Sequence, residues 1–87
     1  MNDRNYTARP HLSIREINGE IVILDRNTEE IHTLNESASY VWSRLDGSLS
    51  RDEIVAGFRE DHGISQATAE ADVDAIIRQF QALELIE

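Results

Sequence analysis

The hydrophobic pattern of the chain changes its period at Leu34-Asn35, inside the stretch EEIHTLNESASYVW. Up to Leu34 the pattern is that of a short strand, whereas from Asn35 the apolar residues recur at helical spacing. No loop separates the two patterns. Strand patterns precede this joint and helical patterns follow it. We therefore predict an α+β fold, with three helices packed on one face of a three-stranded antiparallel sheet.

Three strands are expected before the joint. Residues 11–17 (HLSIREI) alternate apolar and polar side chains, and Asn18-Gly19 is a strong signal for a two-residue hairpin turn. Residues 20–25 (EIVILD) contain a continuous apolar run, which predicts a central strand buried on more than one side. Residues 30–34 (EIHTL) form a short third strand, which a three-stranded meander leaves at an edge of the sheet.

Helix-capping and helix-stop residues divide the remainder into three helices. The residues expected to cap the helix starts are Asn35, Ser50 and either Ser65 or Thr68. The first helix is predicted to run through ESASYVWSRLDG and to stop at Gly47, and the second to end at His62-Gly63. Trp42 and Phe80 are expected to supply the largest side chains of the core.

The 87 residues fit one domain, which we place at residues 11–87, after a flexible polar arm at residues 1–10. The chain has no cysteine, which excludes disulfides and thiolate metal sites. Its longest apolar run, residues 21–24, is far too short to cross a membrane, and the polar start of the chain does not resemble a secretory signal. A cytoplasmic protein without a membrane partner is therefore expected.

The net charge of −9 is concentrated in the helical half, because residues 35–87 carry four Arg against eleven acidic residues. A nucleic-acid partner requires a basic face, so this charge argues against one. Three helices beside a small sheet are nevertheless the composition of a winged helix. A DNA-binding or transcription-associated protein is thus the alternative hypothesis, although its groove-reading third helix would carry Arg78 as its single basic residue.

No arrangement of catalytic or metal-binding residues is evident in the sequence. His11, His32 and His62 are not spaced as metal ligands. The serines lie outside any GxSxG motif, and the four glycines form no phosphate-binding loop. We therefore expect no enzymatic activity, no metal and no cofactor.

The third strand is the feature with a functional interpretation. It contains neither Pro nor Lys, two residues that commonly protect an exposed edge from pairing. An edge of this kind can accept an extended peptide as an additional strand. The N-terminal arm, a helix or a second copy of the chain would cover it equally well, so a structural domain that forms a homodimer through this edge is a further alternative.

Three stretches of the sequence resemble the PqqD-like family. They are VILDRNTEEIHTLNESASYVWSRLDG, SRDEIVAGFREDHGIS and AEADVDAIIRQFQALELI, within residues 19–86. The features that match are Leu34-Asn35 at the joint, Trp42, Leu45-Asp46-Gly47 and Asp72-Val73. The family includes pyrroloquinoline quinone (PQQ) biosynthesis protein D and the recognition elements of systems that modify ribosomally made peptides.

The resemblance implies a fold related to winged helices and the function of a non-catalytic adaptor. Such domains bind the leader segment of a precursor peptide as an extra strand beside the third strand and against the third helix. They present the peptide to a maturase, often a radical-SAM enzyme. The resemblance covers PQQ, lasso-type and other pathways alike.

By position, the resemblance assigns peptide-binding residues to the third strand and the third helix. These residues are Glu30, Ile31, His32, Thr33, Leu34, Val73, Asp74, Ile77, Arg78 and Gln81. Val73 and Ile77 suit the core equally well, and we expect the side chain of His32 to face solvent.

Overall fold

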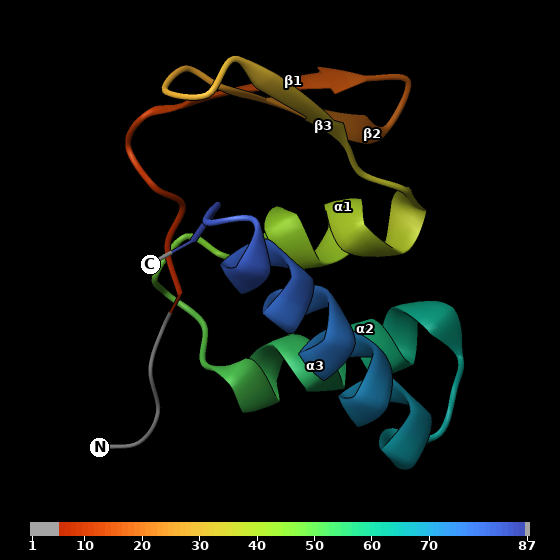
Figure 1. The fold of residues 1–87 in the computed structure, drawn as a ribbon. Helices are drawn as coiled ribbons and strands as arrows, with labels where there is room; N and C mark the ends of the chain where they lie inside the picture. The colour runs from red at the N-terminus through yellow and green to blue at the C-terminus, as the bar shows by residue number, and fades with distance from the viewer. Residues whose placement is uncertain (1–5, 87) are drawn as a thin grey trace.

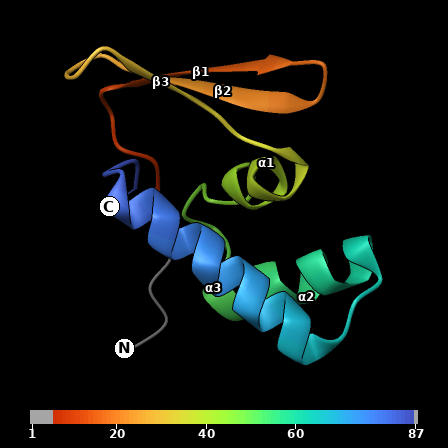
Figure 2. The ribbon, with the colours of Figure 1, turned by 45° about the vertical axis from the view of Figure 1, so that its right-hand side comes forward.

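The computed structural model, which describes residues 6–86, consists of a three-stranded sheet followed by three helices (Figure 1). The elements are β1 (Leu12–Ile17), β2 (Glu20–Asp25), β3 (Glu30–Thr33), α1 (Glu36–Trp42), α2 (Arg51–His62) and α3 (Gln66–Ala82). The sheet forms one layer and the helices lie together on one of its faces, as Figure 2 shows most clearly. The predicted α+β architecture is confirmed.

The sheet is an antiparallel meander with the strand order β1-β2-β3. Asn18 and Gly19 form the first turn with φ angles of 54° and 83°. The alternation of side chains turns Ile23 of β2 toward the helices, where it is fully buried, and turns Leu24 away from them, where it is 37% exposed. The expectation that β2 is buried on more than one side is therefore wrong, because within residues 6–86 no layer covers the outer face.

Backbone hydrogen bonds determine which groups of β3 point out of the sheet. The N–H of Leu34 donates to the carbonyl of Ile21 at 2.8 Å, so the backbone of Leu34 faces β2. Because this direction alternates along an antiparallel strand, the N–H and C=O groups of Ile31 and Thr33 point toward the open edge. These two residues offer the backbone groups that a further strand needs.

The same reasoning applies to β1, which forms the other edge of the sheet. The N–H of Arg26 donates to the carbonyl of His11 at 3.1 Å, and the register continues from that pair. Ile14 and Glu16 therefore point their backbone groups out of the sheet at this edge. β1 and β3 are thus the two edge strands of the sheet, and of these only β3 leads directly into α1.

The first helix begins where predicted and ends earlier. Asn35 caps it, since its side-chain oxygen accepts the N–H of Ala38 at 2.8 Å. The helix ends at Trp42 instead of continuing to Gly47, because the N–H of Leu45 bonds the carbonyl of Trp42 in a tighter turn at 3.0 Å. This turn carries Leu45 into the core, where it is 5% exposed.

The core lies between the sheet and the helices, and α3 packs against both α1 and α2. Trp42 meets Phe80 edge to face with ring centroids 5.2 Å apart, as expected for the two largest core side chains. The predicted capping box of Ser50 and Glu53 starts α2, and Ser65 caps α3. None of the helices in residues 6–86 is both long and apolar enough to cross a membrane.

The segment before β1 differs from the flexible arm expected at residues 1–10. Thr7 pairs with Asp46, and Ala8 pairs with Ile86, in two antiparallel bridges. These bridges tie the start of the described chain to its last residues and to the loop before α2. The part of the expected arm before Tyr6 lies outside the described residues.

Candidate peptide-binding site

Within residues 6–86 no strand pairs with the outer edge of β3, so this edge is open to an additional strand. Figure 1 shows β3 at the front of the sheet, with its end leading straight into α1. Glu30–Thr33 contains no Pro and no Lys, and the side chain of Ile31 is 67% exposed on the outer face of the sheet. Nothing in the sequence of this strand prevents backbone pairing.

His32 occupies the helix-facing side of β3. It pairs with Ile23, which is fully buried, and its side chain is 16% exposed. The expectation that His32 faces solvent is therefore wrong, because cross-strand partners share a face and Ile23 defines this face as the core side. The ring nitrogen Nε2 is buried and has no hydrogen-bond partner, and Glu30 Oε1 lies 3.9 Å from it.

The predicted positions on α3 fall into three environments. Val73 and Ile77 are buried in the core, at 0% and 4% exposure, so they hold the helix in place. Arg78 and Gln81 are exposed on the surface. Asp74 is held against α2 instead of pointing into open space.

The contact of Asp74 with α2 is a two-point ion pair. Arg51 Nε and Nη2 donate to the two carboxylate oxygens of Asp74 at 2.9 and 2.6 Å. The hydrogen bonds from Arg51 lower the pKa of Asp74 and outweigh the opposing effect of partial burial. This pair joins the start of α2 to the middle of α3 and fixes the flank of α3 that faces α2.

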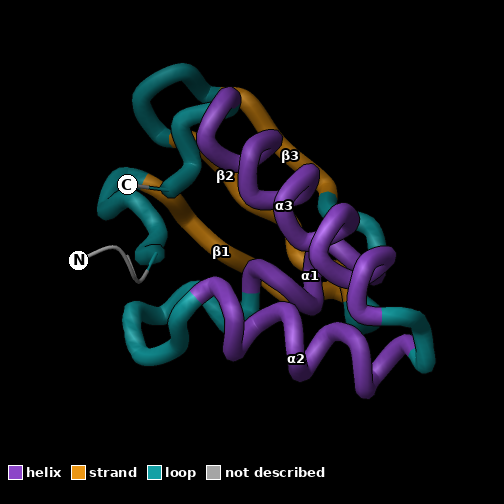
Figure 3. The backbone as a smooth tube through the Cα atoms, turned by 90° about the horizontal axis from the view of Figure 1, so that it is seen from below, coloured by secondary structure: helices purple, strands orange, loops and turns teal. Residues whose placement is uncertain are grey.

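The opposite flank of α3 carries apolar side chains that the sequence-based assignment did not include. At about 100° per residue, Leu83 lies roughly 180° and Ile76 roughly 200° around the helix from Asp74. Leu83 is 38% exposed, and Ile76 is partly buried against the core. Seen from below, β3 lies beyond the flank of α3 that is turned away from α2 (Figure 3). The signal for these two residues was their apolar character just beside the buried stripe.

The outer face of the sheet is apolar next to β3. Leu24 and Ile31 are cross-strand partners there and, with Val22, Ser13 and Arg15, they line a shallow hollow of about 280 Å³. This hollow adjoins the open edge, because Ile31 belongs to both. A strand added beside β3 would extend the same face and cover part of Ile31.

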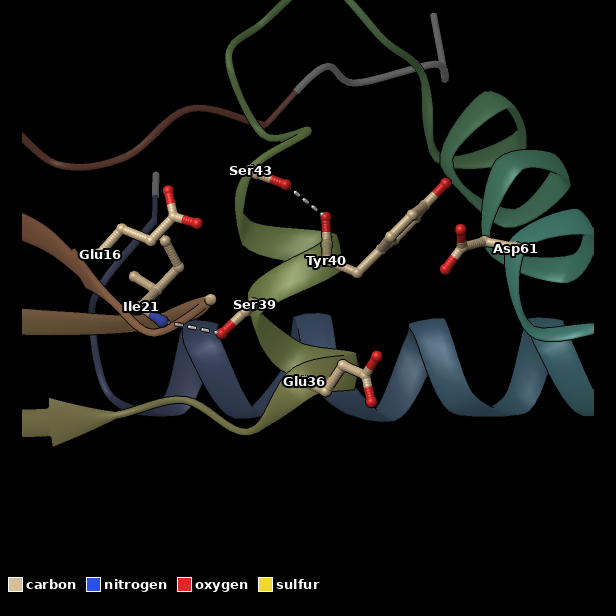
Figure 4. A pocket seen from close by; sticks show the side chains of 8 residues that line it. Glu16, Ile21, Glu36, Ser39, Tyr40, Ser43 and Asp61 are labelled. Atoms are coloured by element: carbon tan, nitrogen blue, oxygen red, sulfur yellow. Dashed lines mark hydrogen bonds between the residues drawn. The ribbon is translucent and has the colours of Figure 1, made fainter.

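A second cavity, of about 200 Å³, lies away from this edge (Figure 4). It is bounded by the β1–β2 turn, α1 and the end of α2, and its acidic residues are Glu16, Glu36 and Asp61. Within residues 6–86 no group of three or more His, Asp or Glu residues is placed to hold a metal ion. The cavity takes no residue from β3 or α3, so it is separate from the candidate peptide-binding site.

Comparison with known protein families gives one match that covers most of the chain. The sequence model of the family described as coenzyme PQQ synthesis protein D (PqqD) matches residues 20–86. No curated protein sequence matches the chain. The matched segment includes β3 and α3, the two elements of the candidate site, together with β2, α1 and α2.

Solved structures with the same fold include two with bound peptides. "TbiB1 in Complex with the TbiA(beta) Leader Peptide" superposes with a TM-score of 0.86 at 25% identity, covering 93% of this chain and 94% of that one. "Lasso peptide synthetase B1 complexed with the leader peptide" gives 0.87 at 20% identity, covering 95% and 98%. "Structure of the heterocyclase TruD" gives 0.67 at 15% identity, and the match covers 95% of this chain but 11% of TruD.

Proposed function

The chain belongs to the PqqD family, and from that premise we propose that it is a non-catalytic adaptor that binds the leader segment of a ribosomally made precursor peptide. The leader adds as a fourth strand beside β3. The structure of TbiB1 in complex with the TbiA(beta) leader peptide supports this proposal, since it shares the fold over nearly the whole of both chains. The comparisons do not favour the DNA-binding alternative.

The observation that carries the proposal is the outward direction of the backbone groups of Ile31 and Thr33 at an unblocked edge. Main-chain hydrogen bonds to these groups provide affinity with little dependence on the leader sequence, and side-chain contacts on either face provide specificity. In the view from below, β3 lies on the side of α3 that is turned away from α2 (Figure 3). Helical spacing puts Ile76 and Leu83 on that side of α3, so they are the α3 residues closest in direction to a leader strand at β3.

The binding residues are divided between the two elements. Glu30, Ile31, His32, Thr33 and Leu34 form the pairing strand and its end. On α3, Arg78 and Gln81 are exposed but lie within about 40° of Asp74 around the helix, on the flank that faces α2, so we assign contact with a leader at β3 to Ile76 and Leu83 instead. Val73 and Ile77 position the helix from inside the core. The ion pair with Arg51 gives Asp74 a similar positioning role.

The bound leader is presented to a maturase, for which a radical-SAM enzyme is our first candidate, and the encounter takes place in the cytoplasm. The domain supplies recognition, and the maturase supplies the chemistry. The net charge of −9 favours a maturase surface or a leader with basic residues.

The test replaces one outward-facing backbone donor. Thr33→Pro removes the N–H that points to the open edge and leaves the hydrogen bonds between β2 and β3 intact. The matched control is Glu16→Pro, which removes an outward-facing N–H from the β1 edge. The leader of a precursor encoded beside the gene is titrated into each variant by calorimetry.

We expect Thr33→Pro to weaken leader binding at least tenfold and Glu16→Pro to bind as the unchanged chain does. Equal binding by a folded Thr33→Pro variant would contradict pairing at β3. Loss of binding in Glu16→Pro alone would move the site to β1. Sedimentation over a concentration range separates these outcomes from the homodimer alternative, in which a second copy occupies the edge.

A further inference from the structure

One buried polar atom in the candidate site has no hydrogen-bond partner. Among the described residues, His32 Nε2 is the one buried side-chain nitrogen or oxygen atom without a hydrogen bond. The nearby Glu30 Oε1, at 3.9 Å, is beyond hydrogen-bonding distance. Buried polar groups without partners are rare in folded proteins, and each one calls for a specific explanation, such as strain, a functional role or a bound partner. Because His32 lies on the helix-facing side of the strand that pairs with the leader, the bound peptide is the partner that we infer for Nε2.

We propose that His32 reads the leader sequence. In this proposal, which rests on the leader-binding function above, the leader residue directly across from His32 carries a hydroxyl or carboxylate oxygen that hydrogen-bonds Nε2. The contact is a specificity determinant added to the sequence-independent pairing of the backbones.

The strand geometry brings a leader side chain within reach of the ring. The backbone of His32 faces β2, so an antiparallel leader meets His32 as a non-hydrogen-bonded pair. In such pairs the Cα atoms are about 4.5 Å apart, and the two side chains lie on the same face and in contact. The leader residue across from His32 therefore lies on the helix-facing side of the sheet, beside the His32 ring. Because Nε2 is covered in the unbound domain, the ring turns about χ2 to meet the leader oxygen.

Glu30 does not obstruct this contact. Its side chain lies two residues before His32 on the same face and is 68% exposed, so it can rotate into solvent when the leader arrives. The leader residue next in sequence faces the other way, toward Ile31 on the outer face. Ile31, which is 67% exposed, therefore contacts a different leader residue from the one that meets His32. Substitution of Ile31 is for that reason a control for the register of the leader.

The experiment is a double-mutant cycle between the domain and the leader. The leader encoded beside the gene is prepared unchanged and with alanine at each Ser, Thr, Tyr, Asp or Glu in turn. Each peptide is titrated by calorimetry into the unchanged domain and into its His32→Leu, His32→Gln and Ile31→Ala variants. Thermal unfolding of each domain without peptide is recorded in parallel.

We expect His32→Leu to weaken binding of the unchanged leader about fivefold to tenfold, the size of one hydrogen bond. Its unfolding midpoint stays the same or rises, because the substitution removes an unpaired buried nitrogen. One leader alanine substitution lowers the affinity for the unchanged domain. The same substitution does not lower the affinity for the His32→Leu variant, because the contact is already lost there. His32→Gln, which keeps a side-chain N–H, recovers part of the affinity, and no leader oxygen couples to Ile31→Ala in this way.

Three results would overturn the proposal while leaving the proposed function standing. In the first, the leader binds His32→Leu as tightly as it binds the unchanged domain. In the second, the losses from His32→Leu and from every leader variant are additive. In the third, the unfolding midpoint and the affinity fall together in both His32 variants, which would make His32 a structural residue. Failure of the leader to bind the unchanged domain at all would instead reject the proposed function itself.

Discussion

The hydroxyl of Ser39 in α1 bonds the carbonyl of Leu34 at the end of β3. Ser39 Oγ donates to this oxygen at 3.2 Å. It also accepts the N–H of Ile21 in β2 at 3.0 Å (Figure 4). The last connection between β2 and β3 thus includes a side chain from the following helix. Ser39 is 5% exposed, so water does not replace it. This arrangement explains how the chain passes from strand to helix without a loop, and it leaves the edge of β3 uncovered.

Ser39→Ala should destabilise the domain by about 2–4 kcal/mol, because it leaves the buried N–H of Ile21 and the carbonyl of Leu34 without their shared partner. Urea unfolding monitored by Trp42 fluorescence measures the difference. Ser37→Ala on the same helix is the control and should change the free energy of unfolding by less than about 0.5 kcal/mol. Similar values for the two variants would mean that the Ser39 bridge contributes little.

Asn35→Ala should cost about 0.5–2 kcal/mol, the usual range for loss of a helix N-cap. The side chain of Asn35 accepts the N–H of Ala38 at 2.8 Å, and alanine has no atom to replace it. Asn35→Asp keeps an acceptor oxygen and should retain most of the stability. If the aspartate variant is as unstable as the alanine variant, Asn35 has a role other than capping.

The sequence predicted the features of the fold that depend on neighbouring residues. The joint at Leu34-Asn35, the turn at Asn18-Gly19 and the capping box of Ser50 all follow from local chemistry. The prediction of the α+β architecture, which the structure confirms, rests on these signals, because each one limits where an element begins or ends.

Features set by distant contacts were not accessible in the same way. The end of α1 at Trp42 depends on where the core accepts Leu45, and the pairing of Thr7 with Asp46 joins segments far apart in sequence. The face of the sheet on which the His32 side chain lies depends on the pairing of His32 with Ile23. The hydrophobic pattern of one strand alone does not specify this pairing. The ion pair of Asp74 likewise requires the packing of α3 against α2.

The ion pair between Arg51 and Asp74 should make stability depend on pH. Hydrogen bonds from Arg51 place the folded-state pKa of Asp74 below its unfolded value of 3.8. The contribution is therefore fully present above that unfolded value and is lost as the pH falls through the folded-state pKa. Because the side chain of Asp74 is 37% exposed, we expect Asp74→Asn to cost only about 0.5–1 kcal/mol at neutral pH.

Urea unfolding of the Asp74→Asn variant and the unchanged domain between about pH 7 and about pH 2 checks this dependence. The difference between their free energies of unfolding should shrink toward zero at the acid end. Asp72→Asn, on the exposed side of the same helix, controls for the change in net charge. A difference that is constant over the whole range would show that the ion pair is not its source.

Gly47→Ala should destabilise the domain more than Gly19→Ala does. Both glycines have positive φ, of 88° and 83°, which costs an alanine roughly 1–2 kcal/mol. A Cβ at Gly47 would also meet Thr7 Cγ2 at 2.9 Å, whereas a Cβ at Gly19 meets nothing within 4 Å. Thermal unfolding of the two variants, and of Gly47→Ala combined with Thr7→Ala, separates the backbone cost from the steric contact. Equal costs at the two glycines would show that the chain before β1 yields to the added methyl group.

Amide hydrogen exchange of the labelled domain, measured by NMR with and without the leader encoded beside its gene, tests the central claim most directly. In the unbound domain the amides of His32 and Leu34 should already be protected, since they face β2, whereas those of Ile31 and Thr33 should exchange rapidly. Saturating leader should then protect Ile31 and Thr33. A leader that binds tightly while the exchange of these two amides is unchanged would contradict strand addition at β3.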